Sequence, residues 1–310
     1  MTTSLPPLPL DEALVLYRVV HLAGRNLAPL TRLAYTRDLS ELLAFLAERH
    51  AAGVPAADEV QPQDLRAFLA ALDERGLKGS YRRRKVAAVR SFFAFLVQHG
   101  AIPASPAEHL VPPERERPQP RVLTEREYKK LLEAVRHETR DGAIVELLLQ
   151  TGLRLSELAR LEVGDVELPA RIVAPNPRTK EPGTTGAVRV QGKGRKQRTV
   201  TLNHKACKAI RAYLAVRPPV DDPRLFITKF GRGIGPRAIE NVVAKYLRLA
   251  GVAGASVHSL RHTFGTQHAR RGTKPAVIRT ALGHESLATT SLYVDLAREE
   301  MERELQEHAL

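Results

Sequence analysis

The segment from Leu260 to Tyr293, LRHTFGTQHARRGTKPAVIRTALGHESLATTSLY, gathers histidines and arginines before one tyrosine, with Glu285 as its only acid. His258 and Arg261 are three residues apart, so on a helix they share a face. A phosphodiester is anionic and resists attack, but guanidinium groups bind its non-bridging oxygens through paired hydrogen bonds. A histidine can accept the proton of a tyrosine hydroxyl, whose ordinary pKa is ~10. The segment therefore indicates a site that holds a phosphate while Tyr293 attacks it.

A further arginine stands in TGLRLSELARL, residues 151–161. Arg154 and Glu157 are three residues apart, so on a helix they can form an ion pair. Taken alone, this pattern is typical of an ordinary surface helix. Together with Arg261, Arg154 would complete a clamp of two guanidiniums on the oxygens where transition-state charge collects.

The stretch QGKGRKQ predicts a β-hairpin tip, because it separates two short β-like runs. The basic residues of this tip are Lys193, Arg195, Lys196 and Arg198. We expect Arg195, Lys196 and Arg198 to contact DNA. A lysine can protonate the sugar oxygen that leaves the phosphorus. A phosphotyrosine intermediate keeps the energy of the broken bond, so a strand could be rejoined without ATP. This chemistry needs neither a metal ion nor a cofactor if side chains supply the positive charge.

Simpler interpretations remain for the same residues. His258 and His262 have the spacing of a helical zinc pair, but no third ligand is evident and Arg261 would lie beside the metal. His262 also fits an ordinary core histidine, and Tyr293 an ordinary buried aromatic. Two rival functions follow: a non-enzymatic basic DNA-binding protein, and a metal-dependent nuclease that chelation would inactivate. The sequence contains no GxxxxGK[ST] motif, which argues against ATP-driven chemistry.

The charge of the chain favours nucleic acid as the partner. The net charge is +14 and the sequence pI is about 10.2. Residues 1–120 carry 15 basic against 13 acidic side chains, and residues 121–310 carry 33 against 21. Residues 171–211 alone contain 11 basic residues, with Glu181 as the one acid. Such clustering is typical of proteins that bind polyphosphate.

The compartment can be inferred from what the sequence lacks. A single cysteine, Cys207, excludes an intramolecular disulfide. The N-terminus has no signal-peptide pattern, and no segment approaches the ~20 apolar residues of a membrane span. We therefore expect a cytoplasmic protein.

The first part of the chain, residues 1–110, predicts a small helical bundle that binds DNA. Residues 30–50 and 80–99 place apolar side chains at helical spacing. Opposite the apolar stripe of the second helix lies a basic set suited to a phosphate backbone, although a solvated face is an equal alternative. This set comprises Arg82, Arg83, Arg84, Lys85 and Arg90. Residues 111–122 are proline-rich and charged, as expected of a linker.

Residues 123–310 predict a mixed domain. Thr124 and Glu127 form a capping-box pattern at the start of a helix. Short β-like runs follow at RIVAP, AVRVQ and RTVTL, and helices are expected from Lys205, Pro236, His258, Lys274 and Ser286. The predicted fold class is mainly α with a small antiparallel β-sheet in the C-terminal domain.

The tail after the tyrosine, residues 294–310, reverses the charge, with six acids against two bases. Ala297, Met301 and Leu305 recur every four residues, so a helix here would carry a narrow apolar stripe. The stripe could pack on its own domain. The alternative, which the family resemblance described next implies and which we favour, is docking into a neighbouring subunit.

In order along the chain, TGLRLSEL, GKGRKQR, HSLRHTFGT and LGHESLATTSLY resemble the motifs of the tyrosine recombinases, also called the phage integrase family. Among these the chain is most similar to the bacterial Xer recombinases. The resemblance extends to TRLAYTRDL in the first half, which is similar to the core-binding domain. Each motif alone is weak, but the set is highly specific.

The resemblance implies a role for each matching residue. Arg154 matches the first catalytic arginine, and Lys193 the hairpin lysine that acts as general acid. His258 and Arg261 match the His-x-x-Arg pair, His284 the second histidine, and Tyr293 the nucleophile. The segment APNPRTKEPGTTG, residues 174–186, makes the interval from Arg154 to Lys193 longer than the family pattern. Lys196 therefore remains an alternative general acid.

The resemblance also implies an architecture and partners. A core-binding domain (residues 1–110) and a catalytic domain (residues 123–310) would form a two-domain C-clamp around double-stranded DNA that carries a two-fold-related site. A homotetramer, or a heterotetramer with a related recombinase, would exchange strands through a Holliday junction. The activity would be integration, or resolution of chromosome or plasmid dimers at cell division with a DNA translocase as a further partner.

Overall fold

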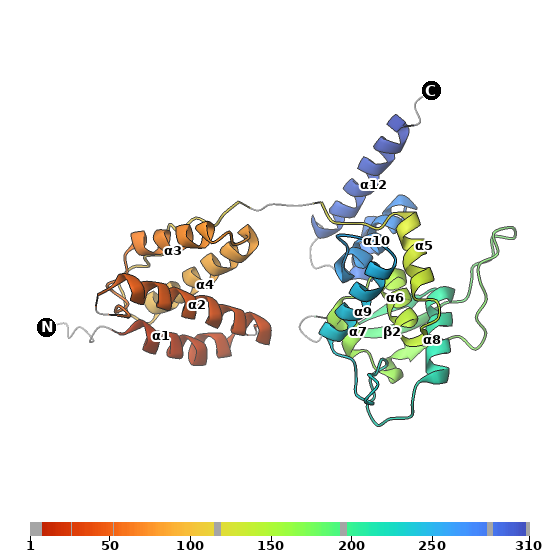
Figure 1. Ribbon diagram of the computed structural model, residues 1–310, viewed down its shortest axis with the longest axis horizontal. Coiled ribbons are helices and arrows are strands. Elements are labelled where there is room, and N and C mark those ends of the chain that lie inside the picture. Colours follow the sequence, from red (N-terminus) through yellow and green to blue (C-terminus); the bar gives the residue numbers. More distant parts are fainter. Residues whose placement is uncertain are drawn as a thin grey trace. The chain divides into compact units, whose positions relative to one another are not determined.

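The computed structural model describes residues 8–25, 27–51, 53–114, 119–192, 197–283 and 288–307. The chain divides into two compact units, unit 1 (Met1–Pro118) and unit 2 (Gln119–Leu310) (Figure 1). Each unit has its own apolar core.

Unit 1 is a bundle of helices packed around apolar side chains. Its helices are α1 (Leu10–Leu16), the π-helical η1 (Tyr17–Leu22), α2 (Pro29–Arg49), α3 (Pro62–Glu74) and α4 (Gly79–Gln98). The apolar positions that predicted α2 and α4 are buried, and the two helices pack against each other. Burial of each such large side chain stabilises the bundle by about 1.5–3 kcal/mol.

Unit 1 also buries a charged cluster, and this corrects one prediction. Lys85 was expected on the exposed basic face of α4, but it is only 4% exposed. Its Nζ donates to Asp38 Oδ1 at 2.9 Å and to Glu41 Oε2 at 2.6 Å. Asp38 is itself 1% exposed, and a buried carboxylate is tolerated only when cations are paired with it. The prediction of an exposed Lys85 was therefore wrong.

Unit 2 contains the remaining elements. Its N-terminal half comprises α5 (Glu125–Ala134), α6 (Thr139–Thr151), α7 (Leu155–Arg160), the 3₁₀ turn η2 (Val163–Asp165), β1 (Val166–Glu167), β2 (Gly186–Gln191) and β3 (Gln197–Leu202). Its C-terminal half comprises α8 (His204–Val216), α9 (Pro236–Leu249), α10 (Val257–Arg270), α11 (Pro275–Leu282) and α12 (Ala288–Glu307). The predicted fold class, mainly α with a small antiparallel sheet, is confirmed. Of the described helices, none combines the length and the apolar character that a membrane span requires.

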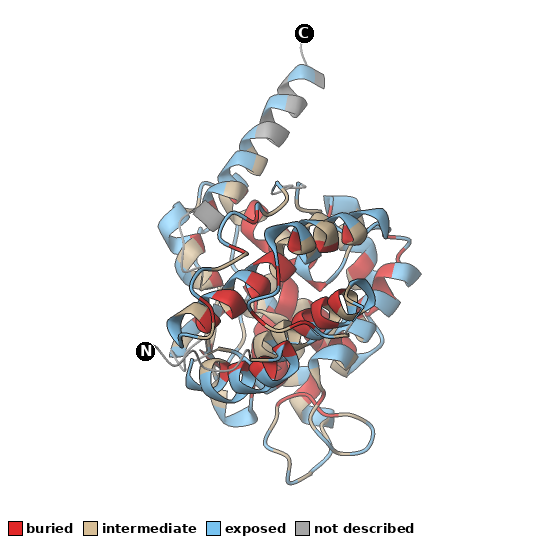
Figure 2. Ribbon diagram, turned by 90° about the vertical axis from the view of Figure 1, so that its left-hand side faces the viewer, coloured by how far each residue is buried: buried red, intermediate tan, exposed pale blue. Residues whose placement is uncertain are grey.

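The start of α5 has the predicted capping box. Thr124 Oγ1 accepts from the backbone N–H of Glu127 at 3.2 Å, and Glu127 Oε2 accepts from that of Thr124 at 2.9 Å. Behind α5, the apolar helix α6 packs against α8 and α10 with Ile144 and Leu147 fully buried. Figure 2 shows buried segments alternating with exposed ones along the helices, as expected when one face of a helix is covered. Helix α6 therefore anchors the elements that surround the site.

The sheet is antiparallel in the order β1-β2-β3. Val188 pairs with Val200, and Val190 with Arg198. Along β3, Val200 and Leu202 are buried while Thr199 and Thr201 are exposed. Because side chains alternate between the faces of a strand, Arg198 falls on the buried face with Val200 and Leu202.

The predicted strand at RIVAP, residues 171–175, is absent, and the third strand is β1 instead. Val173 pairs with Thr184 across a long loop, with the N–H of Thr184 donating to the Val173 carbonyl at 3.0 Å. Pro175 has no N–H to give to a ladder. The inserted residues 174–186 thus belong mainly to a loop that bonds to itself and projects from unit 2 beside α8 (Figure 1).

Candidate active site

The turn after α6 brings Arg154 to the C-terminal helices. Helix α6 ends at Gly152 in the left-handed conformation, with φ of 61°. A Cβ atom at this position would lie 2.6 Å from Leu282 Cδ2 and 2.7 Å from Phe264 Cδ1. Glycine therefore satisfies both the backbone conformation and the close approach to α10 and α11.

Arg261 projects from α10 into the same region and is 8% exposed. Its Nη1 donates to the Gly152 carbonyl at 2.5 Å and its Nη2 to the Leu282 carbonyl at 2.7 Å. Burial, followed by repulsion from Arg154, lowers the pKa of Arg261 to about 10. The guanidinium is therefore still charged at neutral pH, and these two hydrogen bonds go to neutral carbonyls.

Arg154 shares this environment but is more open, with 40% of its side chain exposed. Its Nη2 donates to the Gly283 carbonyl at 2.6 Å, and its Nη1 to Glu157 Oε1 at 3.0 Å. The expected pairing of Arg154 with Glu157 is confirmed. It is not an ordinary surface pair, because the Glu157 side chain is only 1% exposed.

Glu157 is the acidic centre of the cluster, and Arg198 is its main partner. Arg198 Nη1 and Nη2 donate to Glu157 Oε1 and Oε2 at 2.7 and 2.9 Å. Burial raises the pKa of Glu157, but the hydrogen bonds from Arg198 and Arg154 outweigh it and leave the pKa lowered. We expected Arg198 to contact DNA as part of the exposed hairpin tip. That expectation is corrected, because its side chain is 17% exposed and faces inward.

Sequence reasoning missed this position of Arg198, although a signal was present. In QRTVTL the apolar residues Val200 and Leu202 alternate with threonines. The same alternation carried back two residues puts Arg198 on the buried face.

Tyr293 lies on α12 and is 1% exposed. It packs in a small apolar cluster with Phe264, Ile278 and Leu282. A Cβ atom at Gly265 would lie 2.8 Å from the Tyr293 ring, so the glycine provides the space that the ring occupies. Burial raises the pKa of Tyr293, which attraction to Arg261 and Arg154 and a hydrogen bond with Arg261 offset only in part. The hydroxyl is therefore protonated at neutral pH and lies beside the arginines.

The two histidines of α10 have different environments. His258 is exposed on the first turn, three residues before Arg261. His262 is half-buried, and its ring centroid lies 5.8 Å from that of Tyr293. Its Nδ1 is buried without a hydrogen-bond partner, so it differs from the expected satisfied core histidine. Burial, then His258 and Arg261, lowers the pKa of His262, which is consequently neutral at pH 7.

Several predicted residues cannot be placed in this cluster. Lys193, Arg195, Lys196 and His284 lie outside the described residues. Within the described ranges, no group of three or more histidine, cysteine, aspartate or glutamate side chains is arranged to hold a metal ion.

The predicted basic face of α4 is bonded largely within unit 1. Arg82 Nη1 lies 2.7 Å from Asp73 Oδ1, and Arg84 donates to Asp38. Arg83 donates to the Pro113 carbonyl, and Arg90 to the Glu108 carbonyl at 3.0 Å. Of the five predicted residues, only Arg90 is exposed; the other four are partly or fully buried.

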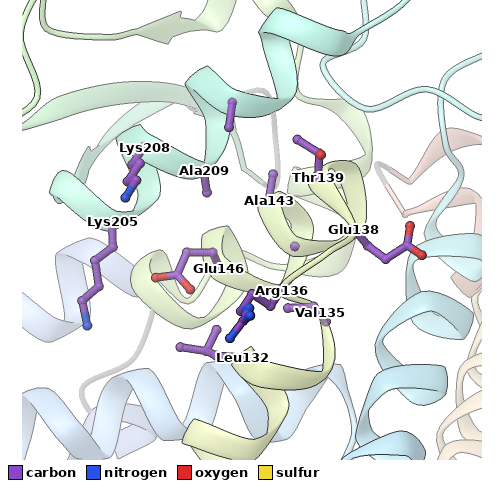
Figure 3. Close-up of a pocket in the computed structure, with 12 residues that line it drawn as sticks. Leu132, Val135, Arg136, Glu138, Thr139, Ala143, Glu146, Lys205, Lys208 and Ala209 are labelled. Atoms are coloured by element: carbon purple, nitrogen blue, oxygen red, sulfur yellow. The ribbon is translucent and has the colours of Figure 1, made fainter.

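A separate cleft of about 400 Å³ opens between α5, α6 and α8 (Figure 3). Leu132, Val135 and Ala209 line it, and Arg136, Lys205 and Lys208 give it a basic rim. Half-buried Glu146 also lines the cleft; burial raises its pKa, and nearby Lys205 opposes this shift. None of the arginines of the Tyr293 cluster lines this cleft.

Comparison with known proteins identifies the class. Residues 121–300 match the phage integrase family, and residues 20–100 match the phage integrase N-terminal SAM-like domain. Tyrosine recombinase XerC of Pelobacter propionicus is 35% identical over 295 residues, covering 93% of this chain and 92% of that protein. Tyrosine recombinase XerC of Chlorobaculum parvum is 33% identical over 306 residues, covering 87% of this chain and 86% of that protein.

Solved structures agree in fold. The post-cleavage complex of the XerH site-specific recombinase with palindromic difH substrate matches with a TM-score of 0.73 and 20% identity, covering 90% of this chain and 80% of that one. A lambda integrase (75–356) dimer bound to a COC′ core site matches with a TM-score of 0.71 and 16% identity, covering 93% and 95%. The chain therefore belongs to the phage integrase family and is a site-specific recombinase of the tyrosine type. The predicted resemblance is confirmed, and a non-enzymatic DNA-binding protein is not favoured.

Proposed function

We propose that Tyr293 is the nucleophile with which this recombinase cleaves and rejoins double-stranded DNA. The observation that supports this most is the convergence of Arg154, Arg261 and Tyr293, from the α6–α7 turn, α10 and α12, around the end of α11. Charged guanidiniums beside a tyrosine hydroxyl suit phosphoryl transfer, because they stabilise the charge that develops on the phosphate oxygens.

In the proposed cleavage reaction each residue acts on a particular atom of the substrate or of Tyr293. Arg154 and Arg261 bind the non-bridging oxygens, and the Tyr293 hydroxyl oxygen attacks the phosphorus. His258 accepts the phenolic proton, with His284 assisting at the phosphate. As the bond to the 5′ oxygen breaks, Lys193 donates a proton to that oxygen; Lys196 is the alternative donor. The product is a 3′-phosphotyrosine, and attack by a 5′ hydroxyl from another strand reverses the sequence without ATP.

The decisive test uses a nicked suicide substrate, from which the cleaved end diffuses away. Wild-type protein should form a covalent protein–DNA band, and Tyr293→Phe should form none while keeping its DNA affinity, which depends on many phosphate contacts. EDTA should not reduce the band, whereas a nuclease using His258 and His262 would be inactivated. A covalent band from the Phe variant would refute the assignment of Tyr293.

The larger assembly is proposed on the strength of the relatives. Relatives that match most of the chain include XerC recombinases, and one solved neighbour is a lambda integrase tetramer bound to a Holliday junction. We infer a two-domain C-clamp, and a homotetramer or heterotetramer on a two-fold-related site. Resolution of chromosome or plasmid dimers in the cytoplasm would be its role, with a DNA translocase as a further partner.

The tail offers a test of assembly. Helix α12 begins against α10 and α11 and then projects from unit 2 (Figure 1). The narrow apolar stripe predicted for the acidic tail is the part that we expect to dock into a neighbouring subunit. A chain truncated after Asp295 should bind a single site normally but lose cooperative assembly and strand exchange. Full recombination by the truncated chain at wild-type concentration would show that the tail is a local cap.

A further inference from the structure

Three arginines converge on the C-terminal end of α11. Arg154 donates to the Gly283 carbonyl at 2.6 Å, Arg261 to the Leu282 carbonyl at 2.7 Å, and Arg198 to the Ala281 carbonyl at 3.4 Å. The last carbonyls of a helix have no partner within the helix, and they carry the negative end of its dipole. The carbonyls at the end of α11 therefore hold the arginines of the proposed phosphate clamp in position.

Arg198 differs from the other two arginines in its second partner. Its guanidinium holds both oxygens of Glu157, whereas the Arg154 guanidinium shares only Oε1 and the Arg154 backbone N–H donates to Oε2 at 2.8 Å. Its guanidinium also lies flat against the end of α11: a Cβ atom at Gly283, where φ is 64°, would lie 2.9 Å from Arg198 Cζ. From its position on β3, Arg198 thus contacts both Glu157 on α7 and the end of α11.

The charges of the clustered side chains indicate the role of these Arg198 contacts. Without Arg198, the Glu157 carboxylate would pair with Arg154 alone and neutralise it. With Arg198 bound to Glu157, the three guanidiniums and one carboxylate leave a net charge of +2 facing the site. That surplus is what an incoming phosphate requires.

We propose that Arg198 is a positioning residue for DNA cleavage, which acts by fixing and neutralising Glu157 so that Arg154 keeps its orientation and its charge for the phosphate. The proposal rests on the proposed roles of Arg154 and Tyr293. It replaces a direct DNA contact by Arg198 with an indirect function. Arg198 itself need not touch the substrate.

The test compares Arg198→Lys and Arg198→Gln with Arg189→Gln. Arg189 is an exposed arginine on the adjacent strand β2 that donates to the Gly164 carbonyl, so its variant controls for the loss of one positive charge. On a suicide substrate, Arg198→Lys should form the covalent adduct about tenfold to a hundredfold more slowly than wild type, since lysine cannot make the fork to Glu157. Arg198→Gln should be slower still. Adduct rates for both variants within threefold of the control would overturn the proposal.

A double-variant comparison separates positioning from direct binding. In a Glu157→Gln background, Arg198→Gln should slow cleavage less than threefold further, because the two residues act through one contact. In the same Glu157→Gln background, Arg198→Gln should leave the slope of log affinity against log salt unchanged, because no carboxylate is left to neutralise Arg154; loss of a direct phosphate contact would reduce the slope by ~1. Multiplicative losses or a reduced slope would refute the proposal.

Two further measurements keep the result interpretable. Thermal melts identify variants that do not fold, and if Arg198→Gln is among them, Arg198→Lys, which keeps a cation beside buried Glu157, decides the question. Wild type and Tyr293→Phe are assayed in parallel. If wild type forms no Tyr293-dependent adduct, the proposed function fails; if it does and the Arg198 variants match the control, only the positioning proposal fails.

Discussion

Both units bring basic side chains together, but the partners of those side chains differ. In unit 1, Asp38 lies between Arg84 and Lys85, and Glu41 takes a second bond from Lys85. In unit 2, Arg261 donates to two main-chain carbonyls, and Arg154 donates to one carbonyl and shares Glu157 with Arg198, which binds both oxygens of that carboxylate. A carboxylate cancels the charge that it binds, whereas a carbonyl orients a guanidinium and leaves it positive. The type of partner oxygen thus distinguishes a structural cation from one that is available to a phosphate.

The largest effect on cleavage is expected when a site arginine loses the hydrogen bonds to carbonyls that orient its guanidinium. Arg154→Lys and Arg261→Lys should each reduce cleavage by about 10²–10³-fold, because lysine keeps the charge but loses the planar fork. Arg217→Lys is the matched control, since Arg217 also binds main-chain carbonyls, those of Asp222, Arg224 and Leu225, and is not among the proposed site residues. Covalent adduct formation at saturating DNA measures the loss. Near wild-type rates for both site variants would contradict the clamp.

The next effect concerns the proton donor rather than the clamp. Lys193→Ala should lose about 10²-fold in cleavage and regain most of it on a substrate whose leaving 5′ oxygen is sulfur, since a thiolate leaves without a proton. The clamp variants should gain nothing comparable from sulfur. If Lys196→Ala is the variant that sulfur rescues, then Lys196 is the general acid.

The two units also differ in how well the sequence predicted them. Apolar spacing predicted α2 and α4, and the capping residues Thr124 and Glu127 predicted the start of α5, because these signals are local. The prediction of a strand at RIVAP was wrong, because the β-like composition of this segment did not reveal that Val173 would pair within the inserted loop. The order of the family motifs along the chain indicated that Arg154, Arg261 and Tyr293 are site residues. The burial of Lys85 and Arg198 depends on partners 47 and 41 residues away, which local patterns do not contain.

A stability effect should appear in unit 1 without an effect on chemistry. Asp38→Asn removes the carboxylate on which Arg84 and Lys85 converge, and leaving buried Lys85 under-compensated should cost about 3–5 kcal/mol of unfolding free energy. Denaturant unfolding measures this loss. The adduct rate per folded, DNA-bound molecule should stay within a few-fold of wild type. A large loss of rate at full saturation would show that the unit 1 cluster takes part in cleavage.

The smallest effect, on DNA affinity, tests most directly whether the type of partner oxygen decides which arginines are available to a phosphate. It compares two arginines on one helix. Arg82 pairs with the carboxylate of Asp73, whereas exposed Arg90 donates to the Glu108 carbonyl and keeps its charge. If α4 lies on the DNA backbone, as one of the two interpretations of its basic face predicts, Arg90→Gln should lower affinity a few-fold and reduce the salt slope by ~1. Arg82→Gln removes the same formal charge but should change the slope less, because Asp73 already offsets Arg82. Binding titrations of Tyr293→Phe carrying each change, over a range of salt concentrations, would measure this without interference from cleavage. Equal slopes for the two variants would mean that the partner oxygen does not decide which arginines reach the DNA.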